Sequence, residues 1–379
     1  MRRNSYRKLP PRADVLEAVT WSVPLMSIAV LSMVLSTSCT RKKDSAASAS
    51  SEAHPQLHGQ KNTNASLVDM IGEPNVTTYP PIGNPRHVPA SEANAFLSAS
   101  DSVFYVRSGK TTYVYPEVIL AVHHVVNDVI DKRPVLVTLC LMADSAILYS
   151  RVVGGKPRIF GALGTATMHR NFVMCDFETD SYWTQLQGES FHGKRRQERL
   201  EILQPLEKAT WAKVQQFGRL KVVPPEVDMS FYRDAHRIML GEAAESATTL
   251  AEKSDRRLKP DARGLGVVVH GQAQFYPIDT PGTPVVNDRV GAWALLVLVD
   301  RDLGSPRIFR RYLDGRVLSF VKDGAALRDR ETRSEWSSDG LCVSGALKGE
   351  RLGTPTYVGA LWYSWSKFHP RTGCYSPPQ

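Results

Sequence analysis

Apolar positions in most of this chain occur in short runs or alternate with polar positions, a pattern that predicts β-strands rather than long helices. The stretch SVFYVRSGKTTYVYP, residues 102–116, has a glycine near its centre, and so has GLGVVVHGQAQFYP, residues 264–277. Each stretch is predicted to fold as a hairpin of two strands that turns at Gly109 or at Gly271.

Helical patterns are confined to a few segments between the predicted strands. The best candidate is FYRDAHRIMLGEAAESATTLAEKS, residues 231–254. Shorter helices are predicted at residues 91–97 and at residues 208–218, the second of which ends in a glycine, as helices often do. The predicted fold class is therefore mainly β (α+β), with peripheral helices.

The tetrapeptide VVND occurs twice, at residues 125–128 and at residues 285–288. Each copy follows one of the predicted hairpins, which both end in Tyr-Pro. Eleven residues separate Pro116 from Asn127 in the first copy, and ten separate Pro277 from Asn287 in the second. The near-equal spacing indicates that the two matches belong to longer similar segments.

A second shared motif lies downstream of each VVND. DFETDSYW, residues 176–183, and DRETRSEW, residues 329–336, agree at five positions as D-x-E-T-x-S-x-W. The chain is therefore predicted to contain two tandem diverged copies of a β-rich unit. Asp, Thr, Ser and Glu side chains can hold a turn through hydrogen bonds, and the Trp can pack beside it. The Asn and Asp of VVND are likewise expected to form a turn that ends an apolar segment.

The N-terminal residues predict export. Basic residues precede an apolar run, residues 19–35, and the sequence STSCT then places Cys39 after small hydroxyl residues. This order is similar to a bacterial lipoprotein signal, with Cys39 as the lipidated residue, although Ser36 stands where such signals normally have Leu. An uncleaved N-terminal helix is the alternative, and ordinary secretion or a cytoplasmic location is a third reading. The predicted location is the extracytoplasmic side of a membrane, such as the periplasm.

These patterns divide the chain into five predicted parts. Residues 40–75 are rich in Ser, Ala and small polar residues and show no apolar period, which predicts a flexible tether. The predicted parts are a signal, lipoprotein or anchor segment at 1–39, the tether at 40–75, a first β-rich repeat at 76–222, a helical connection at 223–262 and a second β-rich repeat at 263–379.

The charge of the chain argues against one class of partner. The net charge is +9, but residues 1–38 carry five Arg or Lys against two acidic residues, so the folded part has only a mild excess. A dedicated nucleic-acid binder would concentrate basic residues on one face. No nucleic-acid partner is therefore expected, and the expected partners are the membrane, through the N-terminus, and a protein or small ligand of unknown identity.

The motifs IGNPRHVPASEA, HHVVND, RNFVMCDFETDSYWTQLQGE, DRETRSEW and ALWYSWSKFHPRTGCY occur in this order. The chain resembles the domain-of-unknown-function family 3179 over about residues 80–375, and this family carries no established reaction. The resemblance places His123 at a typical histidine position and Cys140 at the first position of a C-x-x-C pair. Ala143 stands at the second position, so the pair has diverged, and Cys175 and His124 replace an aromatic residue and a Glu.

A candidate site follows from the differences between the two copies. The first VVND is preceded by two histidines, whereas the second is preceded by Thr and Pro, so chemistry is expected in the first copy alone. The candidate site residues are His123, Asn127, Asp128 and Cys140, with Trp183 as a wall.

Three functions remain open at this candidate site. A metal site with His123 and Cys140 as ligands would suit copper, zinc or haem iron, although no local spacing is that of a metal motif. A thiol- or His-dependent enzyme would use Cys140 as nucleophile and His123 as base, oriented by Asp128 or Glu178. A binding or structural module fits the lack of a phosphate loop, nucleotide fingerprint or serine elbow.

Four cysteines follow Cys39 and permit three disulfide pairings. The simplest scheme joins Cys140 to Cys175 and Cys342 to Cys374, one bond within each copy. Buried free thiols are the alternative state.

Overall fold

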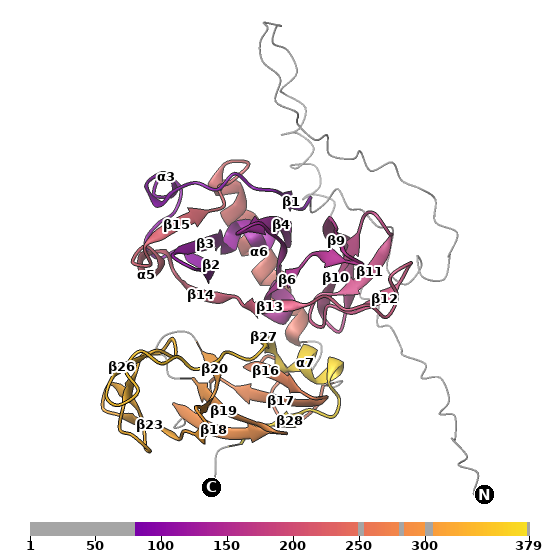
Figure 1. Ribbon diagram of the computed structural model, residues 1–379. Helices are drawn as coiled ribbons and strands as arrows, with labels where there is room; N and C mark the ends of the chain where they lie inside the picture. Colours follow the sequence, from indigo (N-terminus) through magenta and orange to yellow (C-terminus); the bar gives the residue numbers. More distant parts are fainter. Residues whose placement is uncertain (1–79, 249–253, 280–283, 300–305, 377–379) are drawn as a thin grey trace, which may run out of the picture.

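The computed structural model describes residues 80–248, 254–279, 284–299 and 306–376, and strands dominate this part of the chain (Figure 1). The predicted mainly β fold class is thus confirmed. The predicted signal or anchor segment, residues 1–39, with Cys39, and the predicted tether, residues 40–75, lie outside the described residues. None of the helices within the described ranges has the length and apolar character needed to cross a bilayer.

The described part of the first predicted repeat, residues 80–222, is called here the first half. Its main sheet has five strands, of which β4 and β5 pair along six residues, and β1 adds in parallel at the edge. The strands of the first half, sheet by sheet, are β1 (Ile82–Gly83), β4 (Val125–Ile130), β5 (Arg133–Cys140), β6 (Ser145–Ser150) and β13 (Ile202–Pro205); β14 (Glu207–Thr210), β2 (Ser102–Ser108), β3 (Thr111–Pro116) and β15 (Arg219–Val222); β12 (Ser190–His192), β11 (Ser181–Thr184), β10 (Asn171–Asp176) and β9 (Phe160–Met168); and β7 (Val152–Val153) with β8 (Lys156–Pro157).

Residues 263–376 are called the second half, and they form the orange part of Figure 1, below the first half. The predicted hairpins are present in both halves: β2 and β3 join at Gly109 (φ +57°), and β16 and β17 join at Gly271 (φ +82°). The strands of the second half are β27 (Tyr357–Leu361), β16 (Arg263–Val269), β17 (Gln272–Pro277) and β28 (Gly373–Cys374); β18 (Val285–Val290), β19 (Trp293–Leu298) and β20 (Arg307–Arg310); β21 (Tyr312–Leu313) with β22 (Arg316–Val317); and β23 (Phe320–Asp323), β24 (Ala326–Asp329), β25 (Glu335–Trp336) and β26 (Cys342–Ser344).

The helices are few, and those at Glu117–His123 and Trp362–Phe368 are largely buried rather than peripheral. The long predicted helix is α6, which begins after Asp228, whose carboxylate accepts a hydrogen bond from the Ser230 backbone N–H at 2.8 Å. The prediction of a helix at residues 208–218 is largely wrong, because residues 207–210 form β14, paired with β2, and the helix that follows is one turn long. The helices are α3 (Ala90–Ala93), α4 (Glu117–His123), η1 (Leu141–Ala143), α5 (Trp211–Val214), α6 (Met229–Thr248) and α7 (Trp362–Phe368).

The two VVND segments are strands, so the prediction that they form turns is wrong. They lie in β4 and in β18. A buried Asn is tolerated in β4 because its side chain is fully bonded: Asn127 donates to the Phe160 carbonyl at 2.8 Å and accepts from the Phe160 N–H at 2.9 Å. Asn287 bonds Phe320 in the same two ways, at 2.8 and 2.7 Å.

The halves therefore share contacts as well as motifs. Tyr115 donates its hydroxyl to Asp128 at 2.7 Å, and Tyr276 donates to Asp288 at 2.9 Å. The order of hairpins and strands around these pairs is also the same. These recurring bonds agree with the predicted duplication, which itself stays a prediction, as do the predicted boundaries of the repeats.

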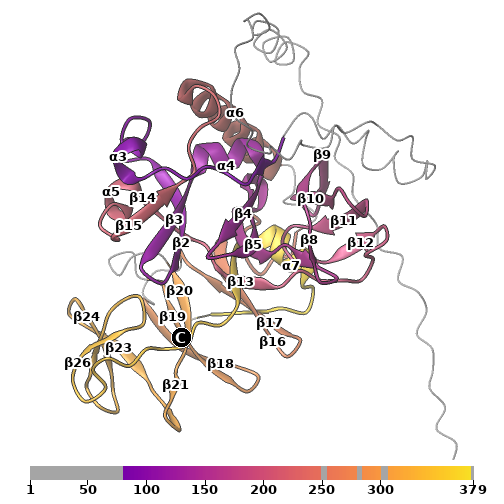
Figure 2. The same ribbon diagram turned by 45° about the horizontal axis from the view of Figure 1, so that its top comes forward.

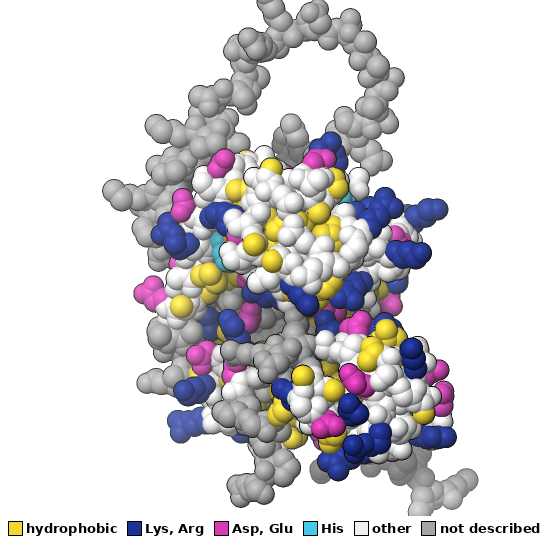
Figure 3. All heavy atoms as spheres, turned by 90° about the vertical axis from the view of Figure 1, so that its left-hand side faces the viewer, with side chains coloured by type: hydrophobic (Ala, Val, Ile, Leu, Met, Phe, Trp, Pro, Cys, Tyr) yellow, Lys and Arg dark blue, Asp and Glu magenta, His cyan; other side chains and the backbone are white. Residues whose placement is uncertain are grey.

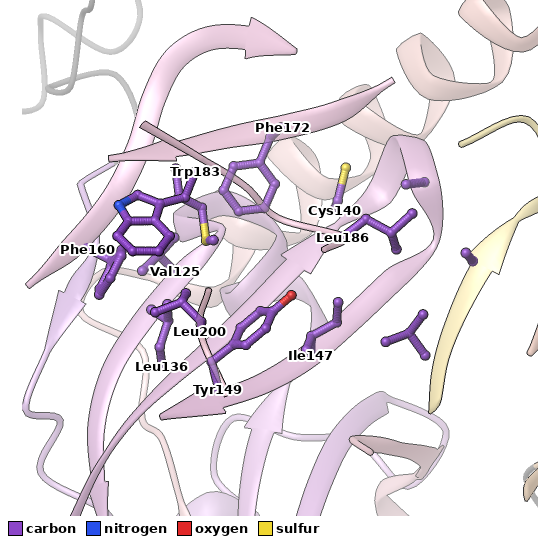
Figure 4. Close-up of a cluster of buried hydrophobic side chains, with 14 of the residues drawn as sticks. Val125, Leu136, Cys140, Ile147, Tyr149, Phe160, Phe172, Trp183, Leu186 and Leu200 are labelled. Atoms are coloured by element: carbon purple, nitrogen blue, oxygen red, sulfur yellow. The ribbon is translucent and has the colours of Figure 1, made fainter. Parts of the chain in front are cut away.

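The largest apolar core crosses from one half to the other (Figure 4). Phe160, Phe172 and Trp183 of the first half lie close together in it, and Phe275 and Trp365 of the second half belong to the same cluster. Figures 1 and 2 both place α7 against the first half, where Ser364 donates to the His169 carbonyl at 2.9 Å. The two halves are thus packed as one body.

Candidate functional site

The D-x-E-T-x-S-x-W motif of the first half holds a buried turn. The Asp176 carboxylate has no exposed surface and accepts three hydrogen bonds, from the Thr179 N–H at 2.8 Å, the Thr179 hydroxyl at 2.6 Å and the Trp183 indole N–H at 3.0 Å. Ser181 extends the network, with its hydroxyl 2.9 Å from that of Thr179. The predicted use of these side chains as turn-holding groups is confirmed.

The same network recurs in the second half. Asp329, also without exposed surface, accepts from the Thr332 N–H at 2.6 Å, the Thr332 hydroxyl at 2.8 Å and the Trp336 indole at 2.9 Å. In the first half, the Trp183 ring lies edge-on to Phe160, with centroids 5.8 Å apart. The structure therefore places Trp183, predicted as the wall of a site, within the core.

Asp128 lies in a polar cluster that sequence reasoning only partly found. Its Oδ2 accepts from the Tyr115 hydroxyl at 2.7 Å and lies 3.0 Å from the His87 Nε2, while its Oδ1 accepts from the Val129 N–H at 2.7 Å. Burial, and next the Asp128 charge, raise the pKa of Tyr115 well above its usual value, so this hydroxyl stays a donor. His87 stands in the IGNPRHVP segment, 41 residues from its partner, and only that motif could have drawn attention to it.

His123 is held in one neutral state by its two partners. Its Nδ1 lies 2.7 Å from the Pro80 carbonyl, which can only accept, so Nδ1 carries the proton. Its Nε2 then accepts from the Tyr232 hydroxyl of α6 at 2.9 Å. Burial lowers the pKa of His123, and it lowers that of His124 to about 4. Both imidazoles are therefore neutral at pH 7.

Cys140 ends β5 and has a different neighbourhood from His123. Its thiol donates to the Arg170 carbonyl at 3.7 Å, and burial raises its pKa, so the nucleophilic thiolate is disfavoured. The Arg170 guanidinium is itself buried and donates to the Ala243 carbonyl of α6 at 2.7 Å. No hydrogen bond among the described residues joins Cys140 to His123, the pair that a thiol enzyme would require.

The remaining cysteines do not follow the predicted pairing. Cys140, Cys175, Cys342 and Cys374 are all free, so the disulfide scheme is wrong and the alternative of free thiols holds. The physical reason is packing: Cys140 belongs to the core shared by the halves, whereas Cys175 packs in a separate small cluster around Tyr182.

The contacts of His123 and Cys140 neither confirm nor contradict the predicted metal site. Within the described ranges, the structure gathers no group of three or more His, Cys, Asp or Glu side chains that could hold a metal ion. The ligand atoms named by the prediction are engaged, since the lone pair of His123 Nε2 meets the Tyr232 hydroxyl. Binding of copper, zinc or haem iron there would have to displace that hydroxyl, and the site stays a prediction.

A cleft of about 210 Å³ lies where the two halves meet, and no sequence motif predicts it. One side is built by β13 and Glu207 of the first half, and the other by β20 and the segment that leads into β27. Its charged lining residues are Arg107, Glu207, Arg307, Asp339 and Arg351.

Ion pairs that join the halves line this cleft. Arg307 pairs with Glu207, which also accepts from the Tyr105 hydroxyl, and Arg307 Nη1 donates to the Ser338 carbonyl at 2.8 Å. Burial disfavours the charge on Arg307, but Glu207 and Tyr105 oppose this effect, and its pKa is raised. Arg307 is thus a positively charged side chain that is almost completely buried.

A second ion-pair group lies at the same cleft. Asp339 is 3.5 Å from Arg107 of the first half and 3.5 Å from Arg351 of the second. Burial would raise the pKa of Asp339, but the hydrogen bond from Ser337 and the charges of the arginines together hold it below its usual value. Asp339 is therefore a carboxylate shared between two guanidinium groups.

Comparison with known proteins gives a family and no activity. A family model described as "Protein of unknown function (DUF3179)" matches residues 77–372. No curated protein and no solved structure matches the chain. The residues of the site must therefore carry any functional argument.

Proposed function

Because this chain belongs to the DUF3179 family of proteins of unknown function, no activity comes with its membership, and from its own geometry we propose that it is a membrane-tethered extracytoplasmic binding module. The observation that carries this proposal is the cleft between the halves, where both halves contribute charged side chains. Clefts between structural units are common ligand sites, because two surfaces can converge there on one molecule.

Three of the predicted site residues support a binding module over an enzyme, because their contacts recur in both halves. Asn127, Asp128 and Trp183 are tied into buried hydrogen bonds, and equivalent bonds exist at Asn287, Asp288 and Trp336 in the second half. A contact that both halves need is explained by folding. The cleft has no such duplicate, because it is formed once, at the junction.

The tether rests on the N-terminal sequence. The basic residues, the apolar run at residues 19–35 and Cys39 are the features that support lipidation or an uncleaved helix. Cys39→Ala is expected to move a lipidated protein from the membrane fraction to the soluble exported fraction of a bacterial host, as measured by cell fractionation. Retention of the variant in the membrane would instead support the uncleaved helix, and a wild-type protein found only in the cytoplasm would sink the proposal of export.

The binding role is tested by a thermal-shift survey of the full-length protein in detergent against metal ions and neutral, cationic and anionic small molecules. At least one class is expected to raise Tm, because a ligand that binds only the folded state stabilises it. The exposed Thr356 lines the cleft, so Thr356→Trp should fill the cleft and abolish the shift. A survey in which no class raises Tm, or in which Thr356→Trp leaves every shift unchanged, would refute a binding module at this cleft.

Two alternative functions can be tested on the same purified protein. Stoichiometric copper, zinc or iron that is lost in His123→Ala would support the metal or haem site. Rapid alkylation of Cys140 in the native protein at neutral pH would support a thiol- or His-dependent extracytoplasmic enzyme, and it would contradict the burial of that thiol.

A further inference from the structure

Arg307 has one unused hydrogen-bond donor beside the cleft. Its side chain is 10% exposed, Nη1 bonds the Ser338 carbonyl, and Nη2 pairs with Glu207. The Nε–H is buried and has no hydrogen-bond partner among the described residues. Because Nε is buried, it is closed to a ligand in the cleft, which would meet Arg307 mainly through its positive charge.

The balance of charge around the cleft is positive. Three guanidinium groups, of Arg107, Arg307 and Arg351, face two carboxylates, of Glu207 and Asp339. Asp339 is shared at 3.5 Å by two of the arginines, and these are partly exposed, at 41% and 54% of their side chains. Both arginines therefore retain N–H groups for a further acceptor. In Figure 3, basic and acidic side chains lie near the waist between the two parts of the molecule.

The size and lining of the cleft limit the ligand. At about 30 Å³ for each water of the liquid, a volume of 210 Å³ corresponds to roughly seven waters, which suits a small organic molecule. Leu203, Pro205, Phe309 and Pro355 add apolar surface to the lining. A ligand with both a carbon skeleton and an anionic group would match this combination.

We propose that the cleft binds a small organic anion whose carboxylate or phosphate group is held by Arg107, Arg307 and Arg351. Guanidinium groups bind these two anions through paired, parallel hydrogen bonds, which a point charge such as Lys cannot provide. Because Arg107 comes from the first half and the others from the second, the ligand bridges the halves. This inference rests on the proposed function and names its ligand class.

The experiment is a calorimetric titration of the full-length protein in detergent with three probes: succinate, glycerol 3-phosphate and the uncharged succinamide. Succinate or glycerol 3-phosphate should bind, and whichever binds more tightly identifies the anionic group, whereas succinamide should not bind. Arg351→Gln and Arg107→Gln, at partly exposed positions, should each weaken binding at least tenfold. Arg316→Gln, at an exposed residue of β22 outside the cleft lining, is the matched control and should bind as the wild type does.

The proposal would be overturned if neither anion binds, if succinamide binds equally well, or if Arg316→Gln weakens binding as much as Arg351→Gln. Failure of the anion class can be distinguished from failure of the binding function. A neutral or cationic molecule whose binding is blocked by Thr356→Trp would leave the binding module standing and refute only the anion. Absence of binding by every class would refute both.

Discussion

Asp176→Ala is expected to lower the free energy of unfolding by about 3–5 kcal/mol, because several buried neutral donors lose their acceptor at a cost of about 1–3 kcal/mol each. The substitution would leave the Thr179 N–H, the Thr179 hydroxyl and the Trp183 indole without their acceptor, at a position with no exposed surface. Urea denaturation followed by the fluorescence of the tryptophans would measure the change.

Two further variants give this prediction its controls. Asp329→Ala removes the same three bonds in the second half, so its cost should be similar. Glu178→Ala removes only an exposed bond to the Ile159 N–H at 3.1 Å and should cost less than about 1 kcal/mol. A loss below about 1 kcal/mol for Asp176→Ala, together with loss of ligand binding, would show that the motif serves function rather than folding.

Features whose determinants are local in the sequence are predictable from it. The hairpins at Gly109 and Gly271 need only alternating strands and a glycine at positive φ, and both determinants lie within about fifteen residues. The turn of the D-x-E-T-x-S-x-W motif is equally local, since the hydrogen bonds that its Asp accepts span at most seven residues. Both features were therefore predictable, as was the mainly β fold class.

Distant contacts explain the errors. VVND was predicted as a turn because Asn and Asp favour turns, but the acceptor and donor for Asn127 are on Phe160, 33 residues away. Residues 208–218 begin as a strand because Glu207–Thr210 pairs with β2, which lies about a hundred residues earlier and overrides local helix propensity.

The cleft could not have been found from the sequence. Glu207 and Arg307 meet across 100 residues, and although Arg307 stands in a PRIF segment that also occurs at residues 157–160, nothing in the sequence links it to Glu207. His87 and Asp128 are 41 residues apart and are likewise brought together only by the fold, although His87 stands in a motif of the family. A comparison of the two halves finds the residues that they share, whereas the cleft is lined by residues that only one half contributes.

Acidification is expected to destabilise the fold through His124, starting below pH 6.5. Burial lowers the pKa of this imidazole from 6.5 to about 4, so the unfolded chain takes up a proton in a range where the folded protein cannot. Stability is therefore complete above pH 6.5 and falls as the pH is lowered, by about 3 kcal/mol at pH 4. Burial also lowers the pKa of His123 and of His369, and both add to the loss in the same direction.

The variant His124→Asn isolates this contribution. His124 has φ +59°, a conformation that Asn tolerates better than most residues, and Asn does not titrate in this range. Urea denaturation at pH 7, 6 and 5 should show a smaller loss of stability on acidification in the variant than in the wild type. His270 also has positive φ, at +47°, but is exposed, so His270→Asn should leave the pH dependence unchanged. Equal slopes for His124→Asn and the wild type would contradict the assignment, because above pH 5 most carboxylates remain ionised and the buried histidines dominate the change.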